Sequence, residues 1–288
     1  MPSKTIALAS VFVALGILNQ VAAQNCACGF IDSNNNVWRE SIVSIFTQNA
    51  GALAAVNANW RIASDNGTLL SNTGFTGKMQ YTSQNVFQWN DALGIKTSAY
   101  TGDNVIRTGE IDTMREDIQY GTFRMVAQVP LNVPGVVFGF FTYINGTQEQ
   151  DIEFLSSDPI YSQTVHYTNQ PGNVNGNADP QATKDVIIPD ADFTFFKEHR
   201  IDWLPTKTMY YFNQTLQTTI TKNVPRTPSL VILNVWSNGD PFFSKGPPTQ
   251  DAIATIQNVH LYFNSTLLSE TSFNTACVNA GRPAQCRI

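Results

Sequence analysis

The sequence predicts an all-β protein in which two antiparallel sheets pack face to face as a sandwich. Runs rich in β-branched and aromatic residues recur along the chain, and turns of Gly, Pro, Asn and Asp separate them. Helical periodicity is scarce, and no stretch has the composition of a linker, a repeat or a low-complexity block. The predicted strands span residues 68–70, 85–89, 121–129, 136–142, 164–168, 208–212, 218–221, 230–235 and 254–263.

The N-terminus has the pattern of a secretory signal peptide. Lys4 precedes an apolar run at residues 5–18, and residues 21–23 (Val-Ala-Ala) form a cleavage site before Gln24. We predict a signal peptide at residues 1–23 and one domain at residues 24–288. A membrane anchor is the alternative, but the run is short for a bilayer, and the C-terminus lacks the hydrophobic tail of a lipid-anchor signal.

The composition argues against two classes of partner. Only 14% of the residues are charged and the net charge is −5. A mildly acidic surface disfavours nucleic acid and anionic membranes. We therefore expect a monomer that is secreted, either extracellular or in the cell wall.

Four cysteines lie near the two ends of the chain, Cys26 and Cys28 at one and Cys277 and Cys286 at the other. In an oxidising compartment they are expected to pair, in one of three connectivities. A bond within Cys-x-Cys is strained, so we predict at least one bond from Cys26 or Cys28 to the C-terminal pair. A metal site is the alternative, and secretion argues against it.

Two further features are an ambiguous segment near the N-terminus and a set of glycosylation sequons. Residues 41–56 are compatible with a strand or with a helix. In a secreted chain, exposed Asn-x-Ser/Thr sequons are acceptors for glycans. The sequons, and the predicted glycosylation sites, are Asn66, Asn145, Asn213 and Asn264.

Three acids, Glu149, Asp151 and Glu153, stand two residues apart. In a strand they would share one face, while Gln150, Ile152 and Phe154 would face the core. Three adjacent carboxylates repel one another and do not favour folding. Such a row is a solvated strand face, a calcium site or a glycosidase site. No ionisable acid or base stands between Val126 and Gln148, so the acids are unusually concentrated.

The segment E-Q-D-I-E-F, preceded by G-F-F-T-Y, resembles the E-x-D-x-E signature of glycoside hydrolase family 16. The spacing is similar to that of lichenases and of fungal cell-wall transglycosylases in this family. Residues 120–124, 199–205 and 233–236 resemble three further strands of the family. The resemblance covers roughly residues 109–263 and implies a concanavalin A-like β-jelly roll with its active site in the concave groove.

The resemblance also implies roles for the acids. Glu149 would be the nucleophile, Glu153 the general acid/base and Asp151 their electrostatic partner. The surroundings depart from the family, because Thr147 and Gln148 replace an aromatic or His residue and an Asp, and Gln150 replaces an apolar residue. A buried amide at position 150 needs partners, or it costs about 1–3 kcal/mol.

A second acidic segment carries Glu110 and Asp112, with Glu116 and Asp117 close by, but lacks a third acid at the E-x-D-x-E spacing. Arg107 and Arg115 are expected to neutralise it. From the family we carry over only Glu110, as a contact to the sugar.

Sugar rings stack on aromatic faces, while polar groups bind their hydroxyls. For each aromatic residue core packing is the alternative, and we assign His199 and Trp203 to the structure. His166 faces the cleft or the core, depending on register. The predicted substrate contacts are Glu110, Phe141, Tyr143, Gln163, Tyr167, Asn234, Trp236 and Phe243.

Together these observations predict a retaining endo-β-glucanase that acts on β-1,3- or mixed β-1,3/1,4-glucan. One alternative is a transglycosylase, in which a sugar hydroxyl replaces water. Another is a lectin-like domain that binds glycan without cleaving it. We predict no cofactor and no metal site, since the structural calcium of some relatives has no dedicated ligand cluster here.

Overall fold

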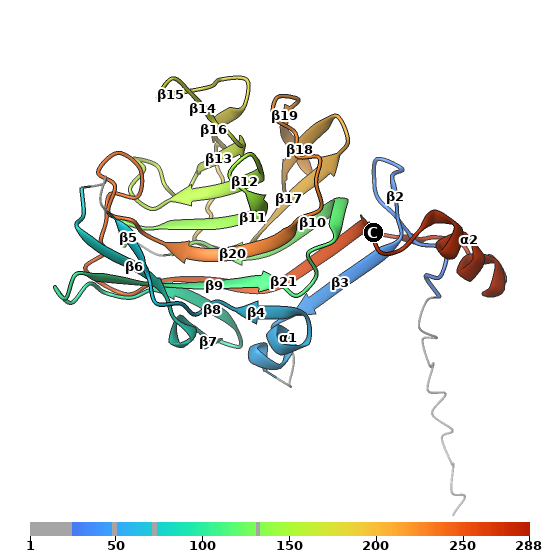
Figure 1. The fold of residues 1–288 in the computed structure, drawn as a ribbon, viewed down its shortest axis with the longest axis horizontal. Coiled ribbons are helices and arrows are strands. Elements are labelled where there is room, and N and C mark those ends of the chain that lie inside the picture. The colour runs from blue at the N-terminus through green and yellow to red at the C-terminus, as the bar shows by residue number, and fades with distance from the viewer. Residues whose placement is uncertain (1–24, 48–50, 71–73, 131–132) are drawn as a thin grey trace, which may run out of the picture.

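Two large sheets make up most of the structure (Figure 1). The computed structural model describes residues 25–47, 51–70, 74–130 and 133–288, so the predicted signal peptide lies outside the described residues. The pairing is antiparallel throughout both sheets except between β6 and β9. The predicted all-β sandwich is confirmed.

We call the 9-stranded sheet the cleft sheet; its main path runs β16-β13-β12-β11-β20-β9-β6-β5, and β4 also pairs with β9. Its strands are β4 (Trp60–Ile62), β5 (Thr68–Leu70), β6 (Gly77–Tyr81), β9 (Val105–Thr113), β11 (Val137–Asn145), β12 (Gln148–Leu155), β13 (Thr164–Asn169), β16 (Thr183–Ile187) and β20 (Leu230–Trp236).

We call the 8-stranded sheet the outer sheet; its main path runs β19-β18-β17-β10-β21-β8-β7, and β3 also pairs with β21. Its strands are β3 (Glu40–Ile45), β7 (Val86–Trp89), β8 (Ala92–Thr97), β10 (Ile118–Gln128), β17 (Lys197–Leu204), β18 (Lys207–Phe212), β19 (Thr215–Ile220) and β21 (Ala252–Ser265).

The core lies between the two sheets. On the cleft sheet it takes alternate residues of β11 and β12, such as Phe140 and Ile152, and on the outer sheet it takes Phe123 and Trp203. Each large apolar side chain buried there contributes about 1.5–3 kcal/mol. The alternation has a direct consequence, because it turns the intervening side chains of β12 away from the core.

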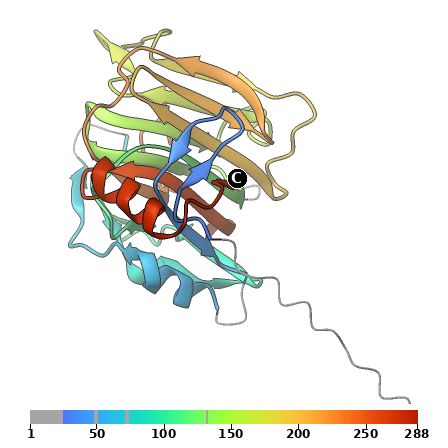
Figure 2. The same cartoon turned by 90° about the vertical axis from the view of Figure 1, so that its right-hand side faces the viewer.

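A small cap joins the two ends of the chain. β1 (Phe30–Ile31) pairs with β2 (Val37–Trp38) and with β22 (Cys286–Arg287). Disulfides join Cys26 to Cys286 and Cys28 to Cys277. Figure 2 shows α2 (Glu270–Asn279) beside these N-terminal strands. The predicted link between the cysteine pairs is confirmed.

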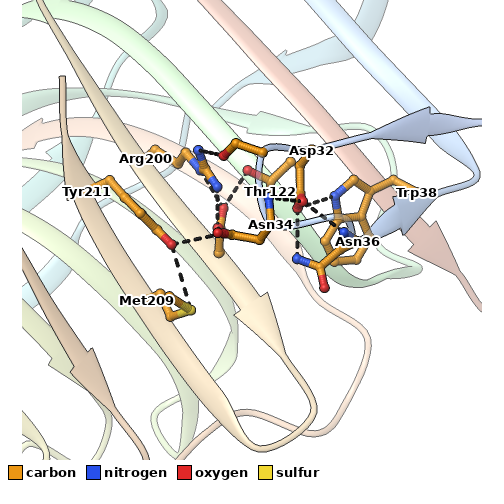
Figure 3. Close-up of polar contacts among 10 residues, drawn as sticks. Asp32, Asn34, Asn36, Trp38, Thr122, Arg200, Met209 and Tyr211 are labelled. Carbon is orange, nitrogen blue, oxygen red and sulfur yellow. Dashed lines mark hydrogen bonds and ion pairs between the residues drawn. The ribbon is translucent and has the colours of Figure 1, made fainter. Parts of the chain in front are cut away.

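A buried polar cluster fixes the cap to the outer sheet (Figure 3). Arg200 and Asp202 form an ion pair in which both side chains are almost completely buried. From the loop between β1 and β2, Asn34 Nδ2 donates to Asp202 Oδ2 (3.1 Å) and to the Tyr211 hydroxyl (3.0 Å). The Arg200 guanidinium lies 4.2 Å from the centre of the Tyr211 ring. Each charge of the pair is therefore compensated.

Most predicted strands correspond to observed ones, and the main differences are helical. The ambiguous stretch at residues 41–56 divides into β3 and the start of α1 (Ala52–Asn59), with residues 48–50 outside the description. α2 was not predicted, because it buries none of its residues and so has no apolar periodicity. A 3₁₀ turn (Ser83–Asn85) and a small hairpin, β14 (Asn173–Val174) and β15 (Asn177–Ala178), complete the elements.

Candidate active site

β12 presents the three acids on one face. Glu149, Asp151 and Glu153 line a cleft of about 410 Å³ on the cleft sheet, while Gln150, Ile152 and Phe154 are buried on the other side. The same alternation on β11, β20, β9 and β6 provides the rest of the lining. The cleft residues are Met79, Tyr81, Glu110, Phe141, Tyr143, Glu149, Asp151, Glu153, Ile232, Asn234 and Trp236.

Strand register sets the width of the floor. Glu153 pairs with Gly139, which pairs with Asn234, which pairs with Glu110. A Cβ on Gly139 would lie 2.7 Å from Asn234 Oδ1. Because Gly139 has no side chain, the bottom of the cleft stays open between Glu153 on β12 and the Asn234–Glu110 pair on β20 and β9.

Burial dominates the electrostatics of the acid row. It raises the pKa of Glu149 to about 7, against a hydrogen bond with Asp151 that lowers it. Burial and the neighbouring charges raise the pKa of Asp151 well above its usual range. The row therefore carries fewer than three negative charges near neutral pH.

Asp151 is anchored on one side only. Its Oδ2 accepts a hydrogen bond from Gln170 Nε2 (3.0 Å). Its Oδ1 is buried and accepts no hydrogen bond from an amide, amine or hydroxyl donor of the described residues. The pKa of Asp151 therefore depends strongly on the charges of Glu149 and Glu153.

Glu110 forms a second polar group across the cleft. Asn234 Nδ2 donates to Glu110 Oε2 (3.0 Å), and the Tyr81 hydroxyl bonds the same carboxyl. Burial raises the pKa of Glu110 to about 7, although both hydrogen bonds oppose the shift. Donors and acceptors of this kind are suited to sugar hydroxyls.

Aromatic side chains surround the acids. Phe141 and Tyr143 pair with Asp151 and Glu149 across the β11–β12 ladder. Trp236 lines the cleft and stacks on Phe243, with ring centres 6.0 Å apart, while Phe243, a predicted contact, is not itself among the cleft residues. These rings offer the apolar surface that a sugar face requires.

Two predicted substrate contacts, one on β13 and one just before it, are not among the cleft residues. Tyr167 is fully buried in the core, where it stacks on Tyr210, so the prediction that it contacts substrate is wrong. Gln163 precedes β13 and is not among the cleft residues. The cause is register: His166 pairs with Glu153 and Thr168 with Asp151, which turns Tyr167 to the core.

Of the two arginines expected to neutralise the second acidic segment, Arg115 does so by binding Asp117, whereas Arg107 binds outside the segment. A third arginine, Arg61, was not expected. Arg61 pairs with Asp112 (2.6 Å) and with Glu116 (2.7 Å). Arg107 binds Asp103, and Arg115 binds Glu40 and Asp117. The expectation missed Arg61 because β4 and β9 meet only through tertiary pairing.

The two unusual glutamines both have partners. Gln150 is fully buried, and its Oε1 accepts from Thr208 Oγ1 (2.8 Å) on the outer sheet, while its Nε2 has no partner among the described residues. Gln148 Oε1 accepts from the backbone N–H of Arg226 (2.7 Å). Both amides bond to other parts of the chain and are not among the cleft residues.

Sequence reasoning missed Met79, Tyr81 and Ile232, and it left His166 open. Tyr81 comes from β6, which joins the sheet through a parallel pairing with β9. No local pattern identifies it. Among the described residues, no group of three or more His, Cys, Asp or Glu side chains is arranged to hold a metal ion.

The structure also places the predicted glycosylation sequons and the helices. Asn66, Asn145 and Asn213 are exposed and Asn264 is half-buried, and Asn145 lies at the end of β11, in the connection to β12. No helix in the described part of the chain has both the length and the apolar character to cross a membrane.

Comparisons with known proteins agree on one family. The model of glycosyl hydrolases family 16 matches residues 65–254. A β-glucanase of Paenibacillus polymyxa is 34% identical over 123 residues, which cover 41% of this chain and 48% of the relative. A Crh-like protein of Arthroderma benhamiae is 27% identical over 168 residues, 55% of this chain and 44% of the relative. The matched region thus spans about half the length of these relatives.

The fold has solved counterparts. A β-glucanase structure from Bacillus licheniformis superposes with a TM-score of 0.59 at 22% sequence identity, covering 78% of this chain and 98% of that chain. At this identity the likeness concerns the fold, and it confirms the predicted jelly-roll sandwich.

Proposed function

The chain belongs to glycosyl hydrolases family 16, and from that premise we propose that it is a retaining endo-β-glucanase. The observation that supports this most is the row of three acids on one face of β12, open to a cleft lined by aromatic and polar side chains. Folding gains nothing from such a row, whereas glycoside hydrolysis requires a pair of carboxyl groups in two protonation states.

In the proposed mechanism Glu149 attacks the anomeric carbon of a bound β-glucan. Glu153 donates its proton to the glycosidic oxygen as that bond breaks, and a glycosyl ester forms on Glu149. The loss of charge on Glu149 favours release of the Glu153 proton. Glu153 then takes a proton from water, which attacks the ester and frees Glu149.

Asp151 supports both steps from between the two glutamates. Burial and the charges of both glutamates oppose its ionisation, which favours a proton within the row. Trp236, Phe141 and Tyr143 would stack on sugar rings, and Glu110 and Asn234 would bind hydroxyls.

We propose β-1,3- or mixed β-1,3/1,4-glucan as the substrate, in line with the β-glucanase names of the relatives. The test is a panel of soluble β-glucans and chitin oligomers, with released reducing sugar as the readout. Activity on one glucan supports the proposal. No cleavage of any glucan by the folded protein contradicts it and favours a lectin-like domain.

A second candidate is transfer to another sugar, which the match to a fungal Crh-like protein favours. The same acids would act, with a sugar hydroxyl in place of water. Longer oligosaccharides at high acceptor concentration, with little reducing sugar, would identify transfer. The same match supports secretion to a cell wall, and the two disulfides fit an oxidising compartment.

A further inference from the structure

Beside Glu153 lies a histidine that the proposed mechanism does not use. His166 on β13 pairs with Glu153 across the β12–β13 ladder, on the cleft side of the sheet. Side chains directly opposite each other in such a ladder have Cβ atoms about 5 Å apart. None of the ion pairs in the described part of the chain involves Glu149, Asp151 or Glu153, whereas the charge of His166 acts on Glu153.

Both ring nitrogens of His166 contact carboxylates. Nε2 lies 2.7 Å from Asp158 Oδ2, and Nδ1 lies 2.7 Å from Asp185 Oδ1. A neutral imidazole carries one N–H, so its other nitrogen would direct a lone pair at a carboxylate oxygen. Carboxylates accept hydrogen bonds and do not donate them, so the two contacts together fit a ring in which both nitrogens donate, an imidazolium.

We propose that His166, held as an imidazolium between Asp158 and Asp185, is a positioning residue that keeps a fixed positive charge beside Glu153. The inference rests on the proposed function for its catalytic meaning, but the charge state is testable without activity. With both nitrogens occupied, the ring is not free to take a proton from water or to bind a sugar hydroxyl.

The charged groups that face His166 come from three elements. Asp185 lies on β16, Asp158 follows β12, and Glu153 lies on β12 itself. Burial lowers the pKa of His166, but the contacts with both aspartates outweigh it and raise that pKa above the usual value. In turn, burial raises the pKa of Glu153 to about 7, and the charge of His166 opposes that rise.

This arrangement would set the pH range over which Glu153 can act as both general acid and general base. Without a nearby cation, burial and the charge of Glu149 would hold the proton on Glu153 more tightly. Glu153 would then donate its proton poorly in the first step and serve as a weaker base in the second. A fixed imidazolium counters this without entering the reaction.

The first test reads the charge of His166 directly. The chain has only three histidines, and burial lowers the pKa of His199 to about 3 and also lowers that of His260. Side-chain ¹⁵N NMR at pH 7.5 should therefore show one imidazolium and two neutral rings. His166→Gln should remove the imidazolium signal, and the control His260→Gln should remove a neutral one. A neutral His166 at this pH overturns the proposal.

The second test reads the effect on Glu153. The alkaline limb of kcat/KM reports loss of the Glu153 proton, and removal of a nearby cation raises a carboxyl pKa by about 1 unit or more. His166→Gln should therefore shift the midpoint of this alkaline limb to a pH about 1 unit higher. His166→Arg keeps the positive charge and should show a midpoint close to that of wild type. A lower rate with an unmoved limb would indicate a merely structural residue and would overturn the proposal.

The two proposals fail in different ways. A wild-type protein that cleaves no glucan contradicts the proposed function, and ¹³C-carboxyl titration of Glu153 in wild type and His166→Gln then replaces the rate profile. The proposal requires a higher Glu153 pKa in the variant. Equal values in both proteins overturn it, whatever the substrate.

Discussion

Two strands of this molecule each bury carboxylates, with opposite treatment of the charge. On β17, Asp202 is fully buried but is paired with Arg200 and hydrogen-bonded by Asn34. On β12, Asp151 is 2% exposed and lies between two further acids, and its Oδ1 lacks a donor among the described residues. A buried charge with its own ion-pair partner holds the scaffold together, whereas a row of acids without an ion pair of its own is maintained at a cost.

The geometry of this chain alone distinguishes a structural acid, Asp202, from a candidate site acid, Asp151. Both clusters face away from the core between the sheets, and both lie on strands of similar length. They differ in their counter-ions and in access, since only the β12 acids line a cleft. Substitutions in the two clusters should therefore change different quantities.

The largest expected effect is on activity. Glu149→Gln removes the proposed nucleophile and should lower kcat on the best β-glucan by at least about a thousandfold. The fold should persist, because the amide has nearly the same shape and carries no charge. Reducing-sugar release, with circular dichroism as the fold check, measures both. A variant that retains a tenth of the activity or more would contradict the assigned role.

The next effect is on stability. Asp202→Ala leaves Arg200 buried without its partner and should lower the free energy of unfolding by about 3–5 kcal/mol. Denaturant unfolding measures the change, and the activity per folded molecule should stay the same. The matched control replaces both partners by apolar residues, Arg200→Met with Asp202→Leu, and should recover most of the loss. A loss below about 1 kcal/mol for Asp202→Ala would place this pair among weakly stabilising surface pairs.

The pH dependence of stability should differ between wild type and Glu149→Gln. Folding raises the pKa of Glu149 from 4.5 to about 7, so the folded state binds more protons than the unfolded state between these values. The wild-type free energy of unfolding therefore loses a contribution as pH rises through this window, and the variant does not.

The stability of Glu149→Gln relative to wild type should thus increase from pH 4.5 to pH 7.5, by about 1–2 kcal/mol. Urea unfolding of both proteins at the two pH values measures it. The difference between the proteins cancels other groups, such as His199, which titrate alike in both. A constant difference would mean that burial does not strain the acid row.

The smallest effect is expected at the second acidic segment. Arg61 has a side chain that is 46% exposed, and it pairs with Asp112. Asp112→Asn should change the free energy of unfolding by less than about 1 kcal/mol and should leave glucan cleavage unchanged. Thermal unfolding and the same activity assay provide the readout. A large loss of activity would contradict the account, because it would indicate a reacting site nearer to β9 than to β12.

Parts of this account could be predicted from the sequence. The orientation of the β12 side chains could be predicted, because side chains of a strand change face at every residue and the three acids stand two residues apart. The same holds for Phe141, Tyr143, Asn234 and Trp236, each on a strand with a clear apolar partner face. Disulfide bonding between the N-terminal and C-terminal cysteines could be predicted from the strain of a bond within Cys-x-Cys.

Other parts depend on register and topology. The choice between His166 and Tyr167 turns on a one-residue shift, and the segment between β12 and β13 sets that shift. Tyr81 and Arg61 reach the cleft sheet through pairings of β6 and β4 with β9 that no local pattern reveals. Helix α2 buries no residue and so leaves no periodic signal.

The most direct test of the central claim is to trap the reaction on the enzyme. A 2-deoxy-2-fluoro-β-glucan oligosaccharide with a good leaving group slows breakdown of a glycosyl ester more than its formation. After proteolysis, mass spectrometry should find the sugar on the peptide that contains Glu149, bound through that side chain, and find none in Glu149→Gln. A label on another residue, or a glucan cleaved with no label and with inversion at the anomeric carbon, would contradict the account.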